Sequence, residues 1–130
     1  MSCPGFVDHL VFRVSKLDRT EHFYTALLDR QPERAEDSLM YMVGDTRLFF
    51  TSLVESHSGI YDKETIGLNH IAFGVCSLTE LEEIREQLDG YGISHSGIHL
   101  DRYGLKEFIW LDDPDGLRIE FYLRPSSPAA

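Results

Sequence analysis

Two short apolar segments of the sequence each contain a histidine at the same place. The segments are VDHLVFRV (residues 7–14) and LNHIAFGV (residues 68–75), so His9 and His70 are 61 positions apart. Both segments are rich in β-branched and aromatic residues, which is typical of buried strands. A repeated strand with a repeated histidine indicates a duplicated unit. With the histidines superposed, other residues coincide: Phe12 with Phe73, Val14 with Val75, Leu17 with Leu78, and Asp8 with the nearly isosteric Asn69.

A third candidate metal ligand follows from the alternation of side chains along strands. In the last apolar segment, residues 117–123, Glu120 lies on the opposite face from Ile119 and Phe121. The same alternation separates His9 and His70 from the apolar faces of their strands. If the sheets curl around one cavity, these three side chains converge there. Two imidazoles and one carboxylate, with coordination positions left open, suit a catalytic Fe(II), Mn, Co, Ni or Zn ion.

A simpler interpretation of Glu120 is a salt bridge. A buried carboxylate needs a partner, because burying an unpaired charge is costly. Arg13, Arg47 and Arg118 are the cations that could supply one. His22 falls in a predicted helix and His57 in a predicted linker, where we expect solvated side chains.

The elements that must hold these residues follow the same plan in both halves of the chain. The first half predicts a strand over 6–14, a helix from Leu17 to Leu28 capped by Ser15, and a hairpin of 38–43 and 46–51 around Gly44-Asp45. The second half predicts a strand at His70, a helix, and strands over 93–99, 107–111 and 117–123.

Two local sequence signals support the elements predicted in the second half. The helix starts at a capping box, formed by Ser77 with Glu80 or by Thr79 with Glu82. The sequence Asp113-Pro114-Asp115-Gly116 is a strong turn signal before the last strand. The whole order predicts an α+β protein with two curved sheets and a helix on the outer face of each.

Composition narrows the classes of partner. The chain has 130 residues, 42% of them hydrophobic, and a formal net charge of −10, which disfavours nucleic acid and anionic membranes as partners. Two cysteines, Cys3 and Cys76, make no disulfide framework and favour a reduced, cytoplasmic setting. The N-terminus lacks the regions of a signal peptide, and no apolar run is long enough to span a membrane. We expect one domain, residues 1–130, with a disordered tail over about 125–130.

The repeated histidine strand and the run DPDGLRIE, residues 113–120, resemble the vicinal oxygen chelate superfamily. That superfamily includes glyoxalase I, type I extradiol dioxygenases, fosfomycin-modifying enzymes, methylmalonyl-CoA epimerase and bleomycin-binding proteins. The resemblance covers about residues 6–124. It implies two tandem βαβββ modules, about 6–53 and 67–124 joined by a linker of about 54–66, in a half-open barrel around one metal. It also implies that His9, His70 and Glu120 match the metal-ligand positions.

One aligned position distinguishes the branches of this superfamily. Aligning the turns Gly44-Asp45 and Asp115-Gly116 sets Phe49 against Glu120. Members with four ligands, such as glyoxalase I, add a residue from that strand of the first module, and phenylalanine cannot ligate. The chain therefore resembles the two-histidine, one-carboxylate members more closely, namely the dioxygenases and fosfomycin-modifying enzymes.

The sequence indicates the acid–base group of the site less clearly than the metal ligands. The run from Ile109 to Glu120 resembles part of the extradiol dioxygenase signature, but Trp110 stands where that signature has tyrosine. The histidine of that signature would fall about seven to nine residues earlier, where the chain has Asp101-Arg102-Tyr103. The remaining catalytic candidates are His99, which shares a predicted strand face with His95, Tyr103, in the loop that also holds Lys106, and Tyr122.

These observations favour a metal-dependent enzyme that chelates two adjacent oxygens of a small substrate, with extradiol-type dioxygenase chemistry slightly ahead. The alternatives are a non-redox, glyoxalase-like lyase, isomerase or thiol transferase, and a small-molecule (drug) binding protein without catalysis. Two sheets in one small chain leave exposed edges, which invite pairing, so we expect a homodimer. The resemblance implies that modules are in some cases exchanged, so that His9 comes from one chain and His70 with Glu120 from the other.

Overall fold

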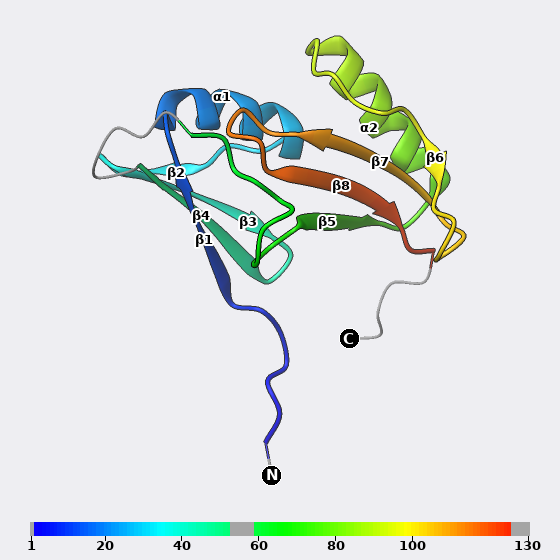
Figure 1. Cartoon of the computed structure of the whole chain (residues 1–130), viewed down its shortest axis with the longest axis horizontal. Coiled ribbons are helices and arrows are strands. Elements are labelled where there is room, and N and C mark those ends of the chain that lie inside the picture. The colour runs from blue at the N-terminus through cyan, green and yellow to red at the C-terminus, as the bar shows by residue number, and fades with distance from the viewer. Residues whose placement is uncertain (1, 53–58, 126–130) are drawn as a thin grey trace. The chain divides into compact units, whose positions relative to one another are not determined.

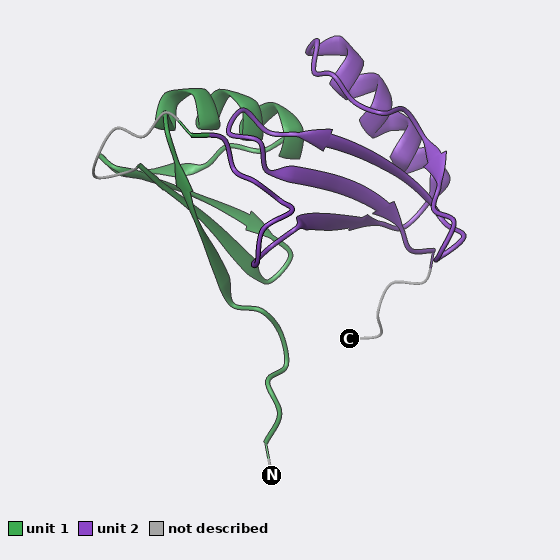
Figure 2. Cartoon of the chain, viewed as in Figure 1, with its two compact units in different colours: residues 1–59 green, residues 60–130 purple. Residues whose placement is uncertain are grey.

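The computed structural model describes residues 2–52 and 59–125, and the chain forms two compact units, Met1–Gly59 and Ile60–Ala130 (Figure 2). The boundary falls inside the stretch that the sequence predicts as a linker. Residues 54–58 of that linker and residues 126–130 of the predicted tail lie outside the described residues. Each unit is described by itself below.

The first unit has the order strand, helix and three strands (Figure 1). Its sheet has the strand order β1-β4-β3-β2, with β1 parallel to β4 and the other pairs antiparallel. The elements are β1 (His9–Val14), α1 (Leu17–Leu28), β2 (Glu33–Arg34), β3 (Ser38–Val43) and β4 (Thr46–Ser52).

The core of the first unit lies between α1 and strands β3 and β4. Burial alternates along β3 and β4, so Leu39, Tyr41, Leu48 and Phe50 are each at most 1% exposed. The ring of Tyr24 in α1 packs on Phe50, with centroids 4.3 Å apart. Helix α1 therefore covers the apolar face of this sheet.

The second unit repeats this order (Figure 1). Its sheet has the strand order β5-β8-β7-β6, with β5 parallel to β8 and the other pairs antiparallel. The elements are β5 (His70–Val75), α2 (Leu78–Gly90), β6 (His99–Leu100), β7 (Glu107–Asp112) and β8 (Arg118–Leu123). The predicted α+β class and the two βαβββ modules are confirmed. The half-open barrel concerns both units together and stays a prediction.

Helix α2 begins at the predicted capping box. The Ser77 side chain accepts a hydrogen bond from the Glu80 amide at 3.1 Å, and the Glu80 carboxylate accepts one from the Cys76 amide at 2.9 Å. These bonds satisfy amides that a helix start otherwise leaves without partners. Leu81 and Leu88 of α2 are at most 1% exposed, and the helix packs on β5, β7 and β8. Neither α1 nor α2, the helices of the described residues, has the length and apolarity needed to cross a lipid bilayer.

Two local predictions were wrong, and one strand was missed. Ser15 does not cap α1: its hydroxyl accepts a hydrogen bond from Arg19, and the N-cap residue is Lys16, which makes no side-chain cap bond. The strand predicted over 93–99 is only His99–Leu100, because Gly97 has a φ of 76° and interrupts extended backbone. The two-residue strand β2 is too short to show a pattern in the sequence.

Candidate metal site

Two of the three predicted ligands lie close together in the second unit. In the parallel register of β5 and β8, His70 is opposite Arg118 and Ala72 is opposite Glu120. The Nε2 atom of His70 is 3.6 Å from Oε1 of Glu120, and their side chains are 39% and 17% exposed. The sequence places both on the face away from α2, and the burial pattern of β8 confirms that alternation. An imidazole nitrogen and a carboxylate oxygen therefore face each other, and both side chains are partly exposed to solvent.

The tautomer of His70 follows from its other nitrogen. Nδ1 of His70 is 2.8 Å from Oδ1 of Asn69. The amide of Asn69 is itself oriented, because its Nδ2 donates to the Lys63 carbonyl at 2.9 Å. The side-chain oxygen of Asn69 must then accept, so Nδ1 of His70 carries the proton and donates it. In the neutral ring this assignment leaves a lone pair on Nε2, the atom that faces Glu120.

With a neutral His70 ring, Nε2 of His70 and Oε1 of Glu120 are thus two acceptors that face each other, and with a protonated ring they form an ion pair. Two acceptors at this distance repel each other unless a cation or a proton lies between them. A histidine that donates its second ring N–H to an oxygen, and keeps its free nitrogen beside a carboxylate, has the arrangement found around metal ligands. The donor set of nitrogen and oxygen fits Fe, Mn, Co, Ni or Zn.

His9 has the matching environment in the first unit. Its Nδ1 is 2.7 Å from Oδ2 of Asp8, and the same oxygen accepts from Arg47 at 2.5 Å. Hydrogen bonds from His9 and Arg47 lower the pKa of the Asp8 carboxyl below its usual value. The carboxylate therefore accepts from Nδ1, and Nε2 of a neutral His9 keeps its lone pair. Asp8 and Asn69, noted in the sequence only as similar neighbours, are the residues that orient the two imidazoles.

The strand registers confirm the predicted alignment of the two halves. In β1 and β4, His9 is opposite Arg47 and Val11 is opposite Phe49. These pairs correspond to His70 with Arg118 and Ala72 with Glu120 in the second unit. Phe49 therefore occupies the position of Glu120, and its ring lies edge-on to the His9 ring with centroids 5.8 Å apart. At these two equivalent positions the first unit supplies an imidazole and a phenyl ring.

Three ligands are not brought together in the part of the chain that the structure describes. Among residues 2–52 and 59–125, no group of three or more His, Cys, Asp and Glu side chains is arranged to hold a metal ion. His9 belongs to the first unit, and His70 with Glu120 belongs to the second. The complete triad stays a prediction.

Two of the arginines considered as salt-bridge partners of Glu120 are engaged elsewhere. Arg118 donates to Asp112 at 2.6 Å and lies over the Trp110 ring, 4.2 Å from its centroid. Arg47 is paired with Asp8. Trp110 is directly opposite Glu120 in the register of β7 and β8, so the cation–π pair flanks the carboxylate.

The predicted catalytic residues His99 and Tyr103 have different surroundings. Nε2 of His99 is 2.8 Å from the Ser96 carbonyl, so it is the protonated nitrogen. Tyr103 is 83% exposed. Nε2 of the neighbouring His95 is 2.7 Å from the Asp89 carboxylate. Catalytic roles for these residues stay predictions.

Tyr122 lies on the same face of β8 as Glu120. Its hydroxyl donates to Asp101 at 2.7 Å, and this bond to a carboxylate raises the pKa of the Tyr122 hydroxyl. Asp101 also accepts from the amides of Tyr103 and Gly104, so it connects the loop after β6 to the sheet. Sequence reasoning missed this role of Asp101. Its position shortly before a glycine-containing turn is the only local signal.

A family model described as "Glyoxalase/Bleomycin resistance protein/Dioxygenase superfamily" matches residues 6–121. The match spans most of the chain, and the chain therefore belongs to this superfamily, the vicinal oxygen chelate superfamily. The sequence is also 34% identical over 59 residues to YaeR of Escherichia coli (strain K12), an alignment that covers 45% of this chain and 43% of that protein. The matched segment is thus less than half of that relative's length.

Solved structures share the fold. A glyoxylase/bleomycin resistance protein/dioxygenase domain from Frankia sp. EAN1pec has a TM-score of 0.76 at 23% identity, covering 94% of this chain and 98% of that one. Lactoylglutathione lyase from Agrobacterium tumefaciens has a TM-score of 0.72 at 15% identity, with coverage of 95% and 97%. The fosfomycin resistance protein FosX from Listeria monocytogenes has a TM-score of 0.71 at 16% identity, with coverage of 94% and 95%. At these identities the likeness extends to the fold alone.

Proposed function

We propose that the protein is a metal-dependent enzyme that binds a small substrate through two adjacent oxygens. The observation that carries this proposal is the pair of acceptors, Nε2 of His70 and Oε1 of Glu120, 3.6 Å apart. Asn69 selects the tautomer that makes Nε2 an acceptor. A bound cation removes the repulsion between these two atoms, and His9 is the third ligand of the proposed site.

The chain's own residues hold and orient the ligands. Asn69 and Asp8 accept the Nδ1 protons of His70 and His9, which leaves both Nε2 atoms free to bind a metal ion. His9, His70 and Glu120 would hold the divalent ion, and its positive charge would polarise two substrate oxygens and stabilise developing negative charge. Trp110 is opposite Glu120 in the strand register, and its ring carries the Arg118 guanidinium over one face, so the other face is the one left for an apolar part of the substrate.

The reaction class has two candidates. A site of two histidines and one carboxylate, with phenylalanine at position 49, favours dioxygenase chemistry at Fe(II). The alternative is a non-redox lyase, isomerase or thiol transferase. In either class the Nε2 proton of His99 is engaged by the Ser96 carbonyl.

Metal content and oxygen uptake test the proposal. Protein purified without added metal or a metal-binding tag is expected to hold, or tightly rebind, about one equivalent of Fe(II), Mn, Co, Ni or Zn. Anaerobic loading with Fe(II), followed by oxygen uptake with a panel of catechols, then separates the two reaction classes. Uptake above background identifies a dioxygenase. Turnover of a hydroxyketone, thiohemiacetal or epoxide with Mn, Ni or Zn, without uptake, identifies the non-redox class.

The metal measurements can also argue against an enzyme. Less than about a tenth of an equivalent of metal, together with no tight rebinding of any of these ions, would favour the non-catalytic binding protein. In that case the His70 and Glu120 side chains would serve as polar groups of a ligand pocket.

We further propose that the protein is a homodimer. The first unit carries one of the proposed ligands and the second carries the other two, so neither unit completes the site by itself. The missing imidazole comes either from the same chain or from a partner chain. Shared ligands would make dimerisation a requirement for metal binding.

Mixing two inactive variants separates these arrangements. If ligands are shared, combining His9→Ala chains with Glu120→Ala chains is expected to restore about a quarter of wild-type activity, since random pairing rebuilds one intact site in about half of the dimers. Each variant incubated alone is the control. No recovery, in a mixture that mass spectrometry shows to contain mixed dimers, assigns all three ligands to one chain. Light scattering that gives the mass of a single chain at micromolar concentration would contradict the dimer itself.

A further inference from the structure

Residues 101–106, which we call the strap, join β6 to β7 beyond the point where β7 pairs with β8. The β7–β8 pairing begins with Phe108 opposite Tyr122, and the preceding residue Glu107 pairs with Leu100 of β6. Strand β6 has two residues and forms two pairs with β7. The strap therefore extends past the sheet on a short two-stranded ribbon, a structure that is only marginally stable by itself.

The strap is hydrogen-bonded within itself, around Asp101. The Asp101 amide donates to the Lys106 carbonyl at 2.8 Å, and the Asp101 carbonyl accepts from the Leu105 amide at 2.7 Å. The Asp101 carboxylate accepts from the amides of Tyr103 and Gly104 at 3.2 and 3.1 Å. Because these bonds hold the backbone of the strap together, it can move as one body.

A single polar contact attaches the strap to β8 within the described part of the chain. The Tyr122 hydroxyl donates to Oδ2 of Asp101 at 2.7 Å. The large apolar side chains of the strap add little packing, since Tyr103 is 83% exposed and Leu105 is 66% exposed. The position of the strap against the sheet therefore depends on the hydroxyl of one tyrosine.

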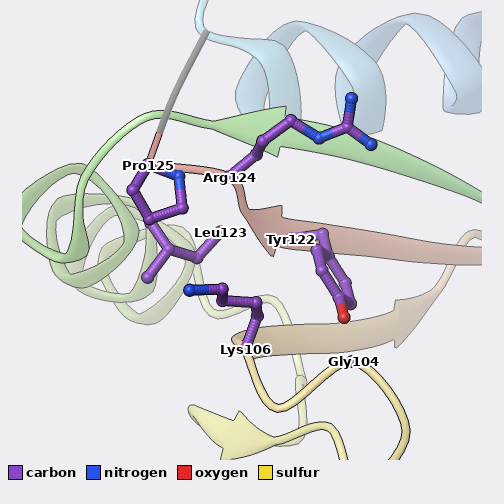
Figure 3. Close-up of a pocket in the computed structure, with 6 residues that line it drawn as sticks. All are labelled: Gly104, Lys106, Tyr122, Leu123, Arg124 and Pro125. Carbon is purple, nitrogen blue, oxygen red and sulfur yellow. The ribbon is translucent and has the colours of Figure 1, made fainter. Parts of the chain in front are cut away.

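The strap lies directly against that hydroxyl. A Cβ on Gly104 would clash with the Tyr122 oxygen, so glycine is the residue that permits this approach. Figure 3 shows the Tyr122 ring reaching from β8 toward Gly104. A pocket of about 450 Å³ lies between residues of the strap and residues at the end of β8, and its lining is Gly104, Lys106, Tyr122, Leu123, Arg124 and Pro125 (Figure 3). The width of this pocket therefore depends on where the strap lies.

We propose that the strap is a hinged cover for this pocket, closed by the contact of Tyr122 with Asp101 and Gly104 and open when that contact breaks. The hinge is the short pairing of β6 with β7. Residues two apart on a strand share a face, so Tyr122 and the candidate metal ligand Glu120 point to the same side of β8. The cover thus closes one end of that face. Its motion goes beyond the proposed function and does not depend on a bound metal.

Limited trypsin digestion of the full-length, metal-free protein tests the hinged cover. The strap contains two trypsin cleavage sites, Arg102 and Lys106, and a protease cuts a folded segment when that segment opens. Tyr122→Phe keeps the ring and removes the hydroxyl. It is expected to raise the rate of cleavage in the strap roughly tenfold, because a hydrogen bond to a carboxylate is lost. Gly104→Ala is expected to act in the same direction, since its Cβ displaces the strap while Tyr122 remains in place.

Matched controls separate opening of the strap from general destabilisation. Tyr91→Phe removes an exposed hydroxyl at the end of α2, and Gly90→Ala adds a Cβ where nothing lies within 4 Å. Both controls are expected to be cleaved in the strap within about twofold of the wild-type rate. Cleavage after Arg85 of α2, followed in the same digests by mass spectrometry, is the internal reference for unfolding of the second unit.

Faster cleavage that is confined to Arg102 and Lys106 supports the hinged cover. Cleavage of Tyr122→Phe and Gly104→Ala at the wild-type rate would overturn it, because the contact would then not hold the strap. An equal rise in cleavage after Arg85 would overturn it too, since the second unit would then unfold as a whole.

Discussion

Replacing His70 or Glu120 by alanine is expected to weaken divalent-metal binding by at least about 100-fold without unfolding the protein. Loss of a residue that only orients a ligand costs about 10- to 100-fold, and loss of the ligand itself costs at least as much. The fold should persist because both side chains are partly exposed, at 39% and 17%, on the face of the sheet away from α2.

Competition with a chromophoric chelator measures the affinity, and circular dichroism with thermal melting measures the fold. Asn69→Leu is expected to fall between wild type and His70→Ala, with a loss of about 10-fold or more, because it frees the His70 ring without removing it. Glu82→Gln and His22→Ala, both at exposed helix positions, are the matched controls. If Glu120→Ala unfolds while Glu82→Gln does not, Glu120 is a structural residue.

Gly116→Ala is expected to lower the free energy of unfolding of the second unit by about 2 to 4 kcal/mol. Gly116 has a φ of 93°, a conformation that alanine adopts only with strain. A Cβ there would clash with the Ile60 side chain and would lie 3.2 Å from the Tyr61 carbonyl oxygen. The Ile60 side chain can move aside. The Tyr61 backbone cannot move as easily, because its amide donates to the Asp115 carbonyl at 2.8 Å.

Urea unfolding of Gly116→Ala beside Gly90→Ala checks this prediction. Gly90 is the last residue of α2, and a Cβ there would meet nothing within 4 Å. Gly90→Ala is therefore expected to leave stability unchanged or to raise it by up to about 1 kcal/mol. Equal unfolding midpoints for the two variants would show that the turn at Gly116 relaxes without cost.

Local patterns were enough to predict most of the fold. The predicted helix over Leu17–Leu28 matches α1, because apolar residues at helical spacing within the segment itself specify it. The Ser77–Glu80 capping box predicted the start of α2 for the same reason. Pairing of short strands depends on distant partners instead. The two residues of β2 pair with β3, and those of β6 with β7, so neither strand has a pattern of its own.

The repeated strand and the alternation of side chains along strands were enough to predict part of the candidate site. The duplicated histidine strand and the face of Glu120 led to the close pair of His70 and Glu120. The bond between Tyr122 and Asp101, 21 residues apart, depends on how a loop folds back onto a strand. Nothing in the sequence near either residue specifies that contact. A metal site shared by His9, His70 and Glu120 likewise depends on contacts between distant parts of the chain, and it stays a prediction.

Phe49 bears on how many metal ions the protein would carry. The two units carry identical residues at two aligned positions, His9 with His70 and Arg47 with Arg118, but at the position of Glu120 the first unit has the phenyl ring of Phe49. In the proposed site, the first unit would therefore contribute the His9 imidazole and no carboxylate from position 49. The stoichiometry expected from this asymmetry is one metal per chain, so a dimer would carry two equivalent ions rather than four.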